Sequence, residues 1–285
     1  MFRSVMITVC EVTDKNLSQF IHFPFDLYKN SPYWVGELKA DTRRLLSPKN
    51  PFWAHAVNKM FLAYKDGVLA GRIMALVNRA HNAYHHENIG FFGFFDVIQD
   101  AEVSHALFNA GEAWLRAQGV QAVRGPANPS SNHVYGLLVN KFDTMPAIMM
   151  PYNFPYYAEL IEKEGFTKIK DVLAFHRTKN EQISPRFLKV CERCMRAKGI
   201  TLRRLNLKHI EQEAEIIRRI YNSAWAENWG FVPMTKEEMA DVVQELKMVV
   251  RPEGTCVLEV DGEPAGFYIA IPNMNHALNE LKGCL

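Results

Sequence analysis

The hydrophobic positions of this chain change period several times, which predicts strands and helices that follow one another. Short runs of β-branched and apolar residues predict strands, and stretches with apolar residues three and four apart predict amphipathic helices. The predicted strands lie at 5–12, 60–64, 68–77, 89–96, 120–124, 167–175, 200–205, 256–260 and 265–271. The predicted helices begin after residue 14 and at 38–46, 101–118, 156–166, 186–198, 211–225 and 236–248. Strands that alternate with helices imply an α/β sheet with crossover helices.

Several residues mark the ends of these elements. Asp14 and Thr235 are expected to cap the helices that follow them, and Gly199 to close the helix before it. Pro24 is expected to bend or end the first helix, because proline lacks the backbone N–H. The stretch 79–87 shows no helical period and is expected to be a loop.

Two parts of the chain resemble each other. The hairpin signal DGVLAG begins at Asp66, and DGEPAG begins at Asp261, an offset of 195 residues. The strand that opens with Ile7 resembles the strand that opens with Ile200, an offset of 193 residues. Two matches at nearly the same offset, with two predicted helices between them in each copy, predict an internal duplication.

The duplication predicts how the chain divides. We expect a complete first domain at 1–178, a linker and helix at 179–199, and the N-terminal half of a second domain at 200–285. The second copy then has no equivalent of 89–175. Its last strand would present a free edge, which proteins normally cover. Either the sequence is a fragment, or residues 272–285 and a partner, such as a second copy of the chain in a homodimer, cover that edge.

Composition and charge exclude several classes of protein. The net charge is +2 and the chain has no dense block of Lys and Arg, so we expect no nucleic-acid partner. No apolar run reaches the roughly 18 residues of a membrane span, and the N-terminus does not resemble a signal peptide. Five scattered cysteines fit a cytoplasmic protein. Cys191 and Cys194 form a lone CxxC without a second ligand pair, which predicts no zinc site.

Three histidines at 81, 85 and 86 are the remaining candidates for metal binding. His81 and His85 are four residues apart, but no carboxylates with suitable spacing complete a ligand set. We therefore expect no metal, and interpret this stretch as a solvated loop or as a cover over a substrate entrance. Metal-dependent hydrolysis is the weakest of the functions that the sequence allows.

Polar residues follow two of the central strands. Asp96 ends an apolar strand, where its carboxylate would orient an amine or act as a base, or would cap the next helix. The turn-rich loop after residue 125 is expected either to bind substrate or to be a structural turn. Its polar members are Asn128, Ser130, Ser131, Asn132 and His133, and only His133 titrates near neutral pH.

Four phenylalanines at 91, 92, 94 and 95 lie on one predicted strand and point to both of its faces. Either both faces are buried in the core, or one face lines a tunnel for an acyl chain or lipid. In the second case Phe94 would contact the substrate.

The order strand, two helices, hairpin, strand, helix, strand, helix, strand resembles the GNAT acyltransferase superfamily. The stretch from Tyr156 to Phe166 resembles the late helix of that superfamily, which ends in Gly-Phe. More narrowly, three motifs resemble a bacterial family of tandem GNAT proteins that includes YghO-like proteins and bacterial ceramide synthases. These motifs are GFFGFFD at 90–96, GPANPS at 125–130, and Pro-Tyr-Asn at 151–153 followed by the two tyrosines at 156 and 157.

The resemblance implies an α/β (α+β) fold with a mixed, mostly antiparallel sheet flanked by helices, followed by a second, partial GNAT-like domain. It also implies transfer of an acyl group from acetyl-CoA, a longer acyl-CoA or acyl carrier protein to an amine. The fourth strand and the loop after it would hold the donor, through Phe95, Val97, Ile98 and Gln99. The R/Q-x-x-G-x-G/A motif of the superfamily is absent from this loop, and Asp100 places a negative charge there. We therefore expect the intact motif in the second copy, beyond Leu285.

The same resemblance assigns roles at the acceptor side. By their position in the late helix, Tyr156 or Tyr157 would donate the proton to the leaving thiolate, or would pack as core residues. Tyr152 is a further candidate for this acid, and with Asn153 it would contact the substrate.

We thus expect an N-acyltransferase that acts on a small-molecule or lipid-like amine, with peripheral membrane contact. The alternatives are a non-catalytic GNAT-like domain that binds a ligand or supports the second copy, and an inactive truncated fragment.

Overall fold

A computed structural model describes residues 5–178, 180–247 and 249–284. The chain divides into two compact units, and each is described by itself. The first unit contains residues 1–169 together with 230–232 and 273–285. The second unit contains residues 170–229 and 233–272. The division into a first domain, a linker and half of a second domain stays a prediction.

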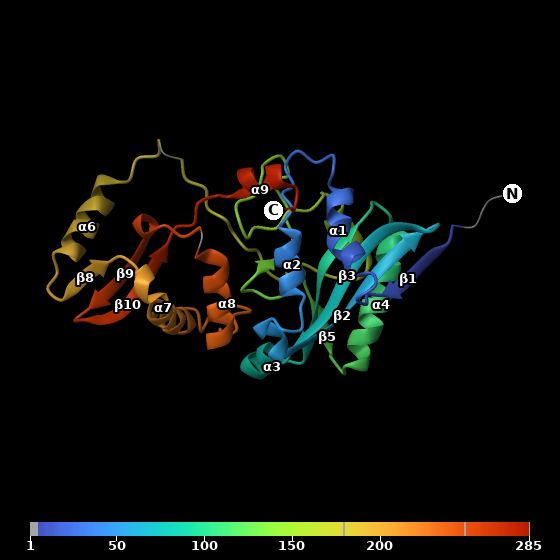
Figure 1. The fold of residues 1–285 in the computed structure, drawn as a ribbon, viewed down its shortest axis with the longest axis horizontal. Coiled ribbons are helices and arrows are strands. Elements are labelled where there is room, and N and C mark those ends of the chain that lie inside the picture. The colour runs from blue at the N-terminus through green and yellow to red at the C-terminus, as the bar shows by residue number, and fades with distance from the viewer. Residues whose placement is uncertain (1–4, 179, 248, 285) are drawn as a thin grey trace. The chain divides into compact units, whose positions relative to one another are not determined.

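The first unit is built on a five-stranded sheet (Figure 1). Its strands lie in the order of the sequence: β1 (Ile7–Glu11), β2 (Ala56–Lys65), β3 (Val68–Asn78), β4 (Ile89–Val97) and β5 (Ala122–Arg124). Neighbouring strands are antiparallel except β4 and β5, which are parallel and joined by the crossover helix α4 (Ala101–Ala117). The expected mixed, mostly antiparallel sheet flanked by helices is confirmed.

Helices cover both faces of this sheet. The helices α1 (Leu17–Leu27) and α2 (Lys39–Leu45) lie on the face opposite α4 (Figure 1). On the α1 side, Phe20 and Ile21 pack against Met74 and Phe94 of the sheet. The other face packs against α4 and α5 (Tyr157–Lys163). Each face therefore carries a closed apolar layer, and all four phenylalanines of β4 are buried.

The remaining elements of the first unit are short. They are the 3-10 turn η1 (Pro51–Ala54), the helix α3 (Arg79–His85), the two-stranded ribbon β6 (Ala127–Asn128) with β7 (Val134–Tyr135), and the helix α9 (Asn275–Leu281).

The second unit holds a three-stranded antiparallel sheet with the order β10-β9-β8. The strands are β8 (Ile200–Arg203), β9 (Thr255–Val260) and β10 (Glu263–Ile269). The helices are α6 (Pro185–Met195), α7 (Ile210–Ala224) and α8 (Lys236–Leu246), with the short turns η2 (Leu207–His209) and η3 (Pro252–Gly254).

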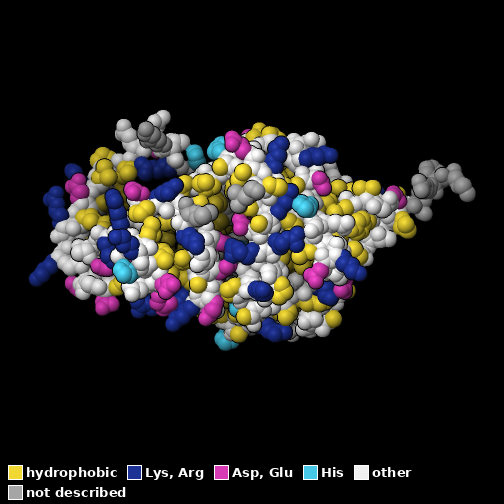
Figure 2. All heavy atoms as spheres, viewed as in Figure 1, with side chains coloured by type: hydrophobic (Ala, Val, Ile, Leu, Met, Phe, Trp, Pro, Cys, Tyr) yellow, Lys and Arg dark blue, Asp and Glu magenta, His cyan; other side chains and the backbone are white. Residues whose placement is uncertain are grey.

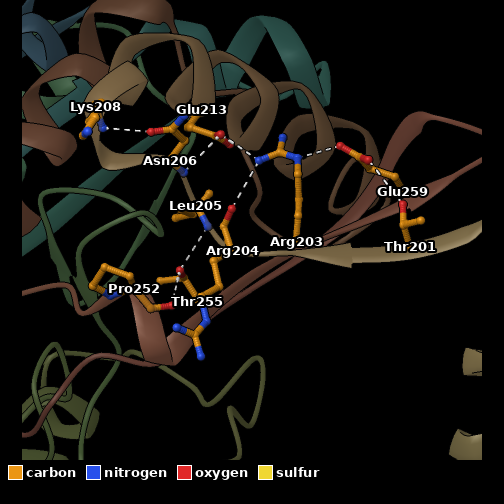
Figure 3. Close-up of polar contacts among 10 residues, drawn as sticks. All are labelled: Thr201, Arg203, Arg204, Leu205, Asn206, Lys208, Glu213, Pro252, Thr255 and Glu259. Carbon is orange, nitrogen blue, oxygen red and sulfur yellow. Dashed lines mark hydrogen bonds and ion pairs between the residues drawn. The ribbon is translucent and has the colours of Figure 1, made fainter.

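A polar network joins β8, β9 and α7 in this unit. Arg203 lies between two carboxylates, with Nη1 2.7 Å from Oε1 of Glu213 and Nε 2.6 Å from Oε1 of Glu259 (Figure 3). The same Glu213 oxygen accepts the backbone N–H of Asn206, which fixes the start of α7 against the strand. Because these bonds join three elements, we interpret the network as structural.

The two sheets share the pairing of their first two strands. In the first unit Ile7 of β1 lies opposite Lys65, the last residue of β2. In the second unit Ile200 of β8 lies opposite Val260, the last residue of β9. Both pairs are antiparallel, and both second strands lead directly into an Asp-Gly turn.

The hairpins that follow also match in detail. The Asp-Gly turns have φ values of 51° and 82° at 66–67, and 52° and 83° at 261–262. Both lie in the left-handed region that two-residue hairpin turns require. In each hairpin the register slips by one residue after the turn, so that Ala70 in one and Ala265 in the other has no direct partner.

Two local expectations about helices are wrong, and so is one alternative of a third. Asp14 does not cap the first helix, whose N-cap is Asn16, and Pro24 does not end that helix, which continues to Leu27. The stretch 79–87 is not a loop, because Asn78 caps a helix there by accepting the backbone N–H of His81.

The predicted last strand, 167–175, is also wrong. The chain there forms no regular structure, and Ile169, Val172, Leu173 and Phe175 are all exposed. An isolated extended segment leaves its backbone groups without a ladder, and no strand of the described residues pairs with it. In the described parts of the chain, no helix combines the length and the apolar character needed to cross a bilayer.

Candidate active site

The candidate site lies where β4 ends, around the carboxylate of Asp96. Arg72 of the neighbouring strand β3 lies opposite Asp96, and both its Nε and Nη2 are 2.7 Å from Oδ2 of Asp96. The two side chains are 9% and 13% exposed, so this ion pair is largely shielded from water. The Arg72 guanidinium also lies over the ring of Phe20, 4.9 Å from its centroid.

A proline explains why Arg72 can reach this position. Inside α1, Pro24 has no N–H to donate to the carbonyl of Phe20 four residues earlier. That carbonyl accepts instead from Nη1 of Arg72, at 2.6 Å. The proline therefore creates an acceptor that helps to hold the arginine against Asp96.

Three tyrosines complete the cluster. The Tyr28 hydroxyl lies 3.0 Å from Oδ1 of Asp96 and 2.8 Å from the Tyr157 hydroxyl. The Tyr157 oxygen accepts the backbone N–H of Val97 at 3.1 Å. Tyr156 donates to the carbonyl of Val97 at 2.7 Å. Asp96, Tyr156 and Tyr157, predicted separately, are thus brought together.

The environment keeps these tyrosines protonated. Burial raises the pKa of Tyr157 well above its usual value, and the negative charge of Asp96 raises it further. Burial and the same carboxylate also raise the pKa of Tyr156. Burial, Tyr157 and Asp96 together raise the pKa of Tyr28. A raised pKa keeps these hydroxyls protonated at neutral pH, so they act as hydrogen-bond donors and not as bases.

The alternative role of Asp96 as a helix cap is wrong. The N-cap of α4 is Asp100, whose Oδ1 accepts the backbone N–H groups of Glu102 and Val103 at 3.0 and 3.2 Å. Lys65 forms an ion pair with the other oxygen of Asp100. The first turn of α4, where an anion would bind, therefore already holds a carboxylate of the chain itself.

Three of the four residues predicted to hold the acyl donor are buried or hydrogen-bonded within the chain itself. Phe95 is buried in the core, both backbone groups of Val97 are bonded to tyrosines, and the N–H of Ile98 donates to the carbonyl of Ala70. Gln99 is exposed. The arrangement does not fit CoA binding through these backbone groups and the start of α4.

The polar loop after β5 contacts the middle of β4. Oδ1 of Asn128 accepts the backbone N–H of Phe94 at 2.6 Å. Phe94 has a φ of 44°, so the strand bulges here and its N–H turns toward the loop. Gly93 permits the close approach, because a Cβ at that position would lie 1.7 Å from the carbonyl oxygen of Ala127.

The rest of this loop holds another segment of the first unit. Ser131 donates to the carbonyl of Gly230 at 2.8 Å, and Asn132 donates to the carbonyl of Val232 at 3.3 Å. Ser130 is buried, and its hydroxyl lies 2.8 Å from Nδ1 of His133. The Ser130 hydroxyl therefore helps to orient the His133 ring.

Tyr152 and Asn153 do not join the Asp96 cluster by hydrogen bonds in the described structure. The Tyr152 hydroxyl lies 3.1 Å from the Ser31 hydroxyl, while the ring packs edge-on against Tyr28. Asn153 is buried and bonds to both backbone groups of Leu138, at 2.8 and 3.2 Å. Asn153 therefore braces the loop before the late helix.

The histidine stretch forms an internal contact. His81 is 3% exposed, and its Nε2 lies 2.9 Å from a carboxylate oxygen of Glu87. Burial lowers the pKa of His81, and Glu87 partly opposes that effect. His85 donates from Nε2 to the carbonyl of Phe231 at 2.6 Å. The interpretation as a solvated loop is wrong for His81, and no group of three metal-binding side chains occurs among the described residues.

Arg72 and Tyr28 are the functional candidates that the sequence did not reveal. Tyr28 follows a helix that was expected to bend or end at Pro24, and Arg72 lies in an otherwise apolar strand. The signal that could have revealed Arg72 was its charge within an apolar strand, since a charged side chain on a buried strand needs a partner.

Comparison with known proteins identifies relatives over nearly the whole chain. No family model matches it. Protein YghO of Escherichia coli is 37% identical over 95% of this chain and 69% of its own length. Bacterial ceramide synthase of Caulobacter vibrioides is 34% identical over 96% of this chain and 71% of its own length.

Solved structures resemble the chain only distantly. An aminoglycoside acetyltransferase from a soil metagenome, in complex with trehalose, is 14% identical over 60% of this chain and 95% of its own, with a TM-score of 0.38. A glucosamine N-acetyltransferase region of a fungal multi-domain β-N-acetylglucosaminidase is 13% identical over 92% of this chain and 27% of its own, with a TM-score of 0.48.

Proposed function

The chain belongs to the family of Protein YghO and bacterial ceramide synthase, and from this premise we propose that it is an N-acyltransferase of the GNAT type. It would transfer an acyl group from acyl-CoA or acyl carrier protein to an amine. The observation that carries the proposal is the buried cluster of Asp96, Arg72 and three tyrosines at the end of β4. The element order of the first unit, with its parallel β4–β5 pair, is consistent with it.

Within this cluster we assign the proton donor to Tyr156. Acyl transfer from a thioester needs an acid that protonates the leaving thiolate. Tyr156 is half-buried, whereas Tyr157 is 1% exposed and its oxygen is engaged by Val97 and Tyr28. Tyr157 would therefore act as a positioning residue.

Asp96 would position the tyrosines rather than take a proton. One of its carboxylate oxygens is held by Arg72 and the other by the hydroxyl of Tyr28. His133, oriented by Ser130, is the better candidate to accept the proton of the amine.

A lipid-like amine is the substrate that we favour. The support is the name of the ceramide synthase relative and the run of four phenylalanines on β4. All four are buried here, so an acyl tunnel along β4 would have to open on binding. A small-molecule amine stays the alternative.

A tandem arrangement agrees with the matched hairpins of the two units. They share strand order, register, turn and the slip at Ala70 and Ala265. We propose that the second unit repeats the first half of the first unit. A homodimer that covers the free edge of β10, and a cytoplasmic location, stay proposals as well; light scattering of the purified chain tests the dimer.

The test of the function is release of free thiol. The full chain is incubated with an acyl-CoA and candidate amines, and thiol is followed with a chromogenic disulfide. Amine-dependent release, with the acylated amine identified by mass spectrometry, supports the proposal. No release with any amine, from a folded protein, counts against it.

A second function is favoured by one observation. Asp100 occupies the first turn of α4, and tyrosines engage both backbone groups of Val97. The first unit would then bind a ligand or support the second unit without catalysing transfer. Calorimetric titration of the full chain with CoA separates the two functions, because this second function predicts no heat of binding.

A further inference from the structure

The helix α6 (Pro185–Met195) of the second unit is amphipathic, and its apolar face is exposed among the described residues. None of its residues is buried. Phe187 is 60% exposed and Val190 is 52% exposed, and Leu188 and Met195 are also exposed. An apolar helix face normally packs against a core, so an uncovered one marks an interaction site.

The apolar and charged residues of this helix lie on opposite sides. At 100° per residue, Phe187, Val190, Cys191 and Cys194 fall on one side, and Leu188 and Met195 flank them. The opposite side carries Arg186, Lys189, Arg193 and Arg196, with Glu192 at its margin. Within α6 no Lys or Arg lies among the apolar residues of the first side.

Positive charge is concentrated in this part of the chain. Residues 185–198 contain five Lys or Arg and one Glu, a net charge of +4, whereas the whole chain has a net charge of +2. Figure 2 shows Lys and Arg side chains next to hydrophobic ones over the region of α6 and β8. A basic polar face beside an exposed apolar face is the pattern of a helix that lies in the interface of an anionic membrane.

We propose that α6 docks the protein on the surface of an anionic lipid bilayer. The apolar face would enter the boundary between headgroups and acyl chains, and the basic face would lie against anionic headgroups. Val172, Leu173 and Phe175, exposed in the chain just before the helix, would add apolar contact. This inference rests on α6 alone and does not depend on the acyl-transfer proposal.

Vesicle flotation with the full chain tests the proposal without any acyl donor or amine. We expect the protein to float with vesicles of phosphatidylcholine and phosphatidylglycerol, and to stay behind with pure phosphatidylcholine. Binding should weaken as salt is raised, because salt screens charges near a surface. Failure to float with the anionic vesicles at low salt overturns the proposal.

Two variants separate the contributions of the faces. K189Q with R193Q removes two charges, each contributing about a fivefold change in partition, so binding should fall roughly 25-fold. F187S with V190S should reduce it by roughly tenfold or more through lost apolar burial. All four side chains are exposed, so unchanged circular dichroism and melting temperature are expected.

The matched control is K15Q with K29Q, which removes two exposed charges from the first unit. It should leave vesicle binding unchanged. An equal loss in the control and in K189Q with R193Q would assign the binding to net charge and overturn the role of α6. Conversion of a dimer to a monomer by F187S with V190S, without any effect on vesicle binding, would assign the helix to a protein interface and overturn it too.

Discussion

Arg72 and Asp96 form a buried ion pair that joins β3 to β4 at the candidate site, with both contacting nitrogens 2.7 Å from one carboxylate oxygen. The second oxygen of Asp96 faces the hydroxyl of Tyr28. Asp96 therefore contacts the sheet through one oxygen, which binds Arg72, and the tyrosine cluster through the other, which binds Tyr28. A buried charge whose partner is removed is strongly destabilising, whereas replacing both partners by apolar residues is often tolerated.

We accordingly predict different effects for single and double substitutions at this pair. R72M should lower the free energy of unfolding by about 3–5 kcal/mol, because it leaves the Asp96 carboxylate buried without its cation. R72M with D96L should be clearly less destabilised than R72M alone. Urea denaturation measures both, and additive effects of R72M and D96L would contradict a direct interaction.

The tyrosines predict a specific loss of stability at high pH. Tyr28, Tyr156 and Tyr157 have raised pKa values in the folded protein, so the folded state holds their protons more tightly than the unfolded state. Their contribution is complete below about pH 10, the usual tyrosine value, and is lost as pH rises toward the folded pKa. Each group should lower the free energy of unfolding by about 1.4 kcal/mol per pH unit in that range.

Denaturation of wild type and Y157F at pH 8 and pH 11 checks this slope. Y157F removes one titrating hydroxyl, so the free energy of unfolding should fall less between pH 8 and pH 11 than in wild type, by the contribution of one tyrosine. Y33F is the control, since Tyr33 is not among the tyrosines of the cluster. The same alkaline loss in Y157F as in wild type would contradict a raised pKa at this residue.

Substitution of the two adjacent tyrosines distinguishes an acid from a positioning residue. Y156F should reduce kcat by roughly 10²–10⁴-fold if Tyr156 donates the proton. Y157F should act mainly on stability, by about 1–3 kcal/mol, because it leaves the buried N–H of Val97 without an acceptor. Thiol-release kinetics with protein of verified folding measure the two, and the reverse order of effects on kcat would exchange the assigned roles.

Two substitutions of Asp100 distinguish the contribution of its helix cap to stability from the contribution of its charge. D100A should lower the free energy of unfolding by about 1 kcal/mol, because two N–H groups at the start of α4 lose their acceptor. D100N should lose less, since Asn is an equally good N-cap, although it removes the ion pair with Lys65. Thermal denaturation compares the two, and equal losses would show that the charge rather than the cap is what counts.

Much of the first unit was predictable because its signals are local. Apolar runs and the Asp-Gly turn at 66–67 are sufficient for the hairpin of β2 and β3. The errors arise where a distant partner decides the structure. Pro24 does not end its helix, and the carbonyl that it leaves free accepts from Arg72, which is far away in the sequence.

In the candidate site, too, individual residues were predictable from the sequence, whereas the contacts between distant residues were not. Asp96 was a candidate because it ends an apolar strand, and Tyr156 and Tyr157 were separate candidates because of their position in the late helix of the resembled superfamily. Their shared network depends on Tyr28, which no local pattern distinguishes from a core tyrosine. The polar loop after β5 was expected either to bind substrate or to be a structural turn, and its side chains hydrogen-bond to backbone groups of the chain itself.

Two glycines provide the sharpest test of the geometry at β4. At Gly93 an added Cβ would lie 1.7 Å from the carbonyl oxygen of Ala127, a backbone atom that cannot rotate away. G93A must therefore push the loop off the strand and weaken the bond from Phe94 to Asn128. At Gly111 in α4 the nearest side-chain atom, in Ala75, lies 3.6 Å from the added Cβ, which is ordinary contact.

The same substitution should consequently have opposite effects at the two positions. G111A should raise the free energy of unfolding by up to about 1 kcal/mol, because alanine favours a helix over glycine. G93A should lower it by roughly 3 kcal/mol or more, in the range of severe steric and backbone changes. Chemical denaturation of both variants measures the difference. A G93A protein as stable as wild type would mean that the loop does not approach β4 as closely as the Asn128 contact requires.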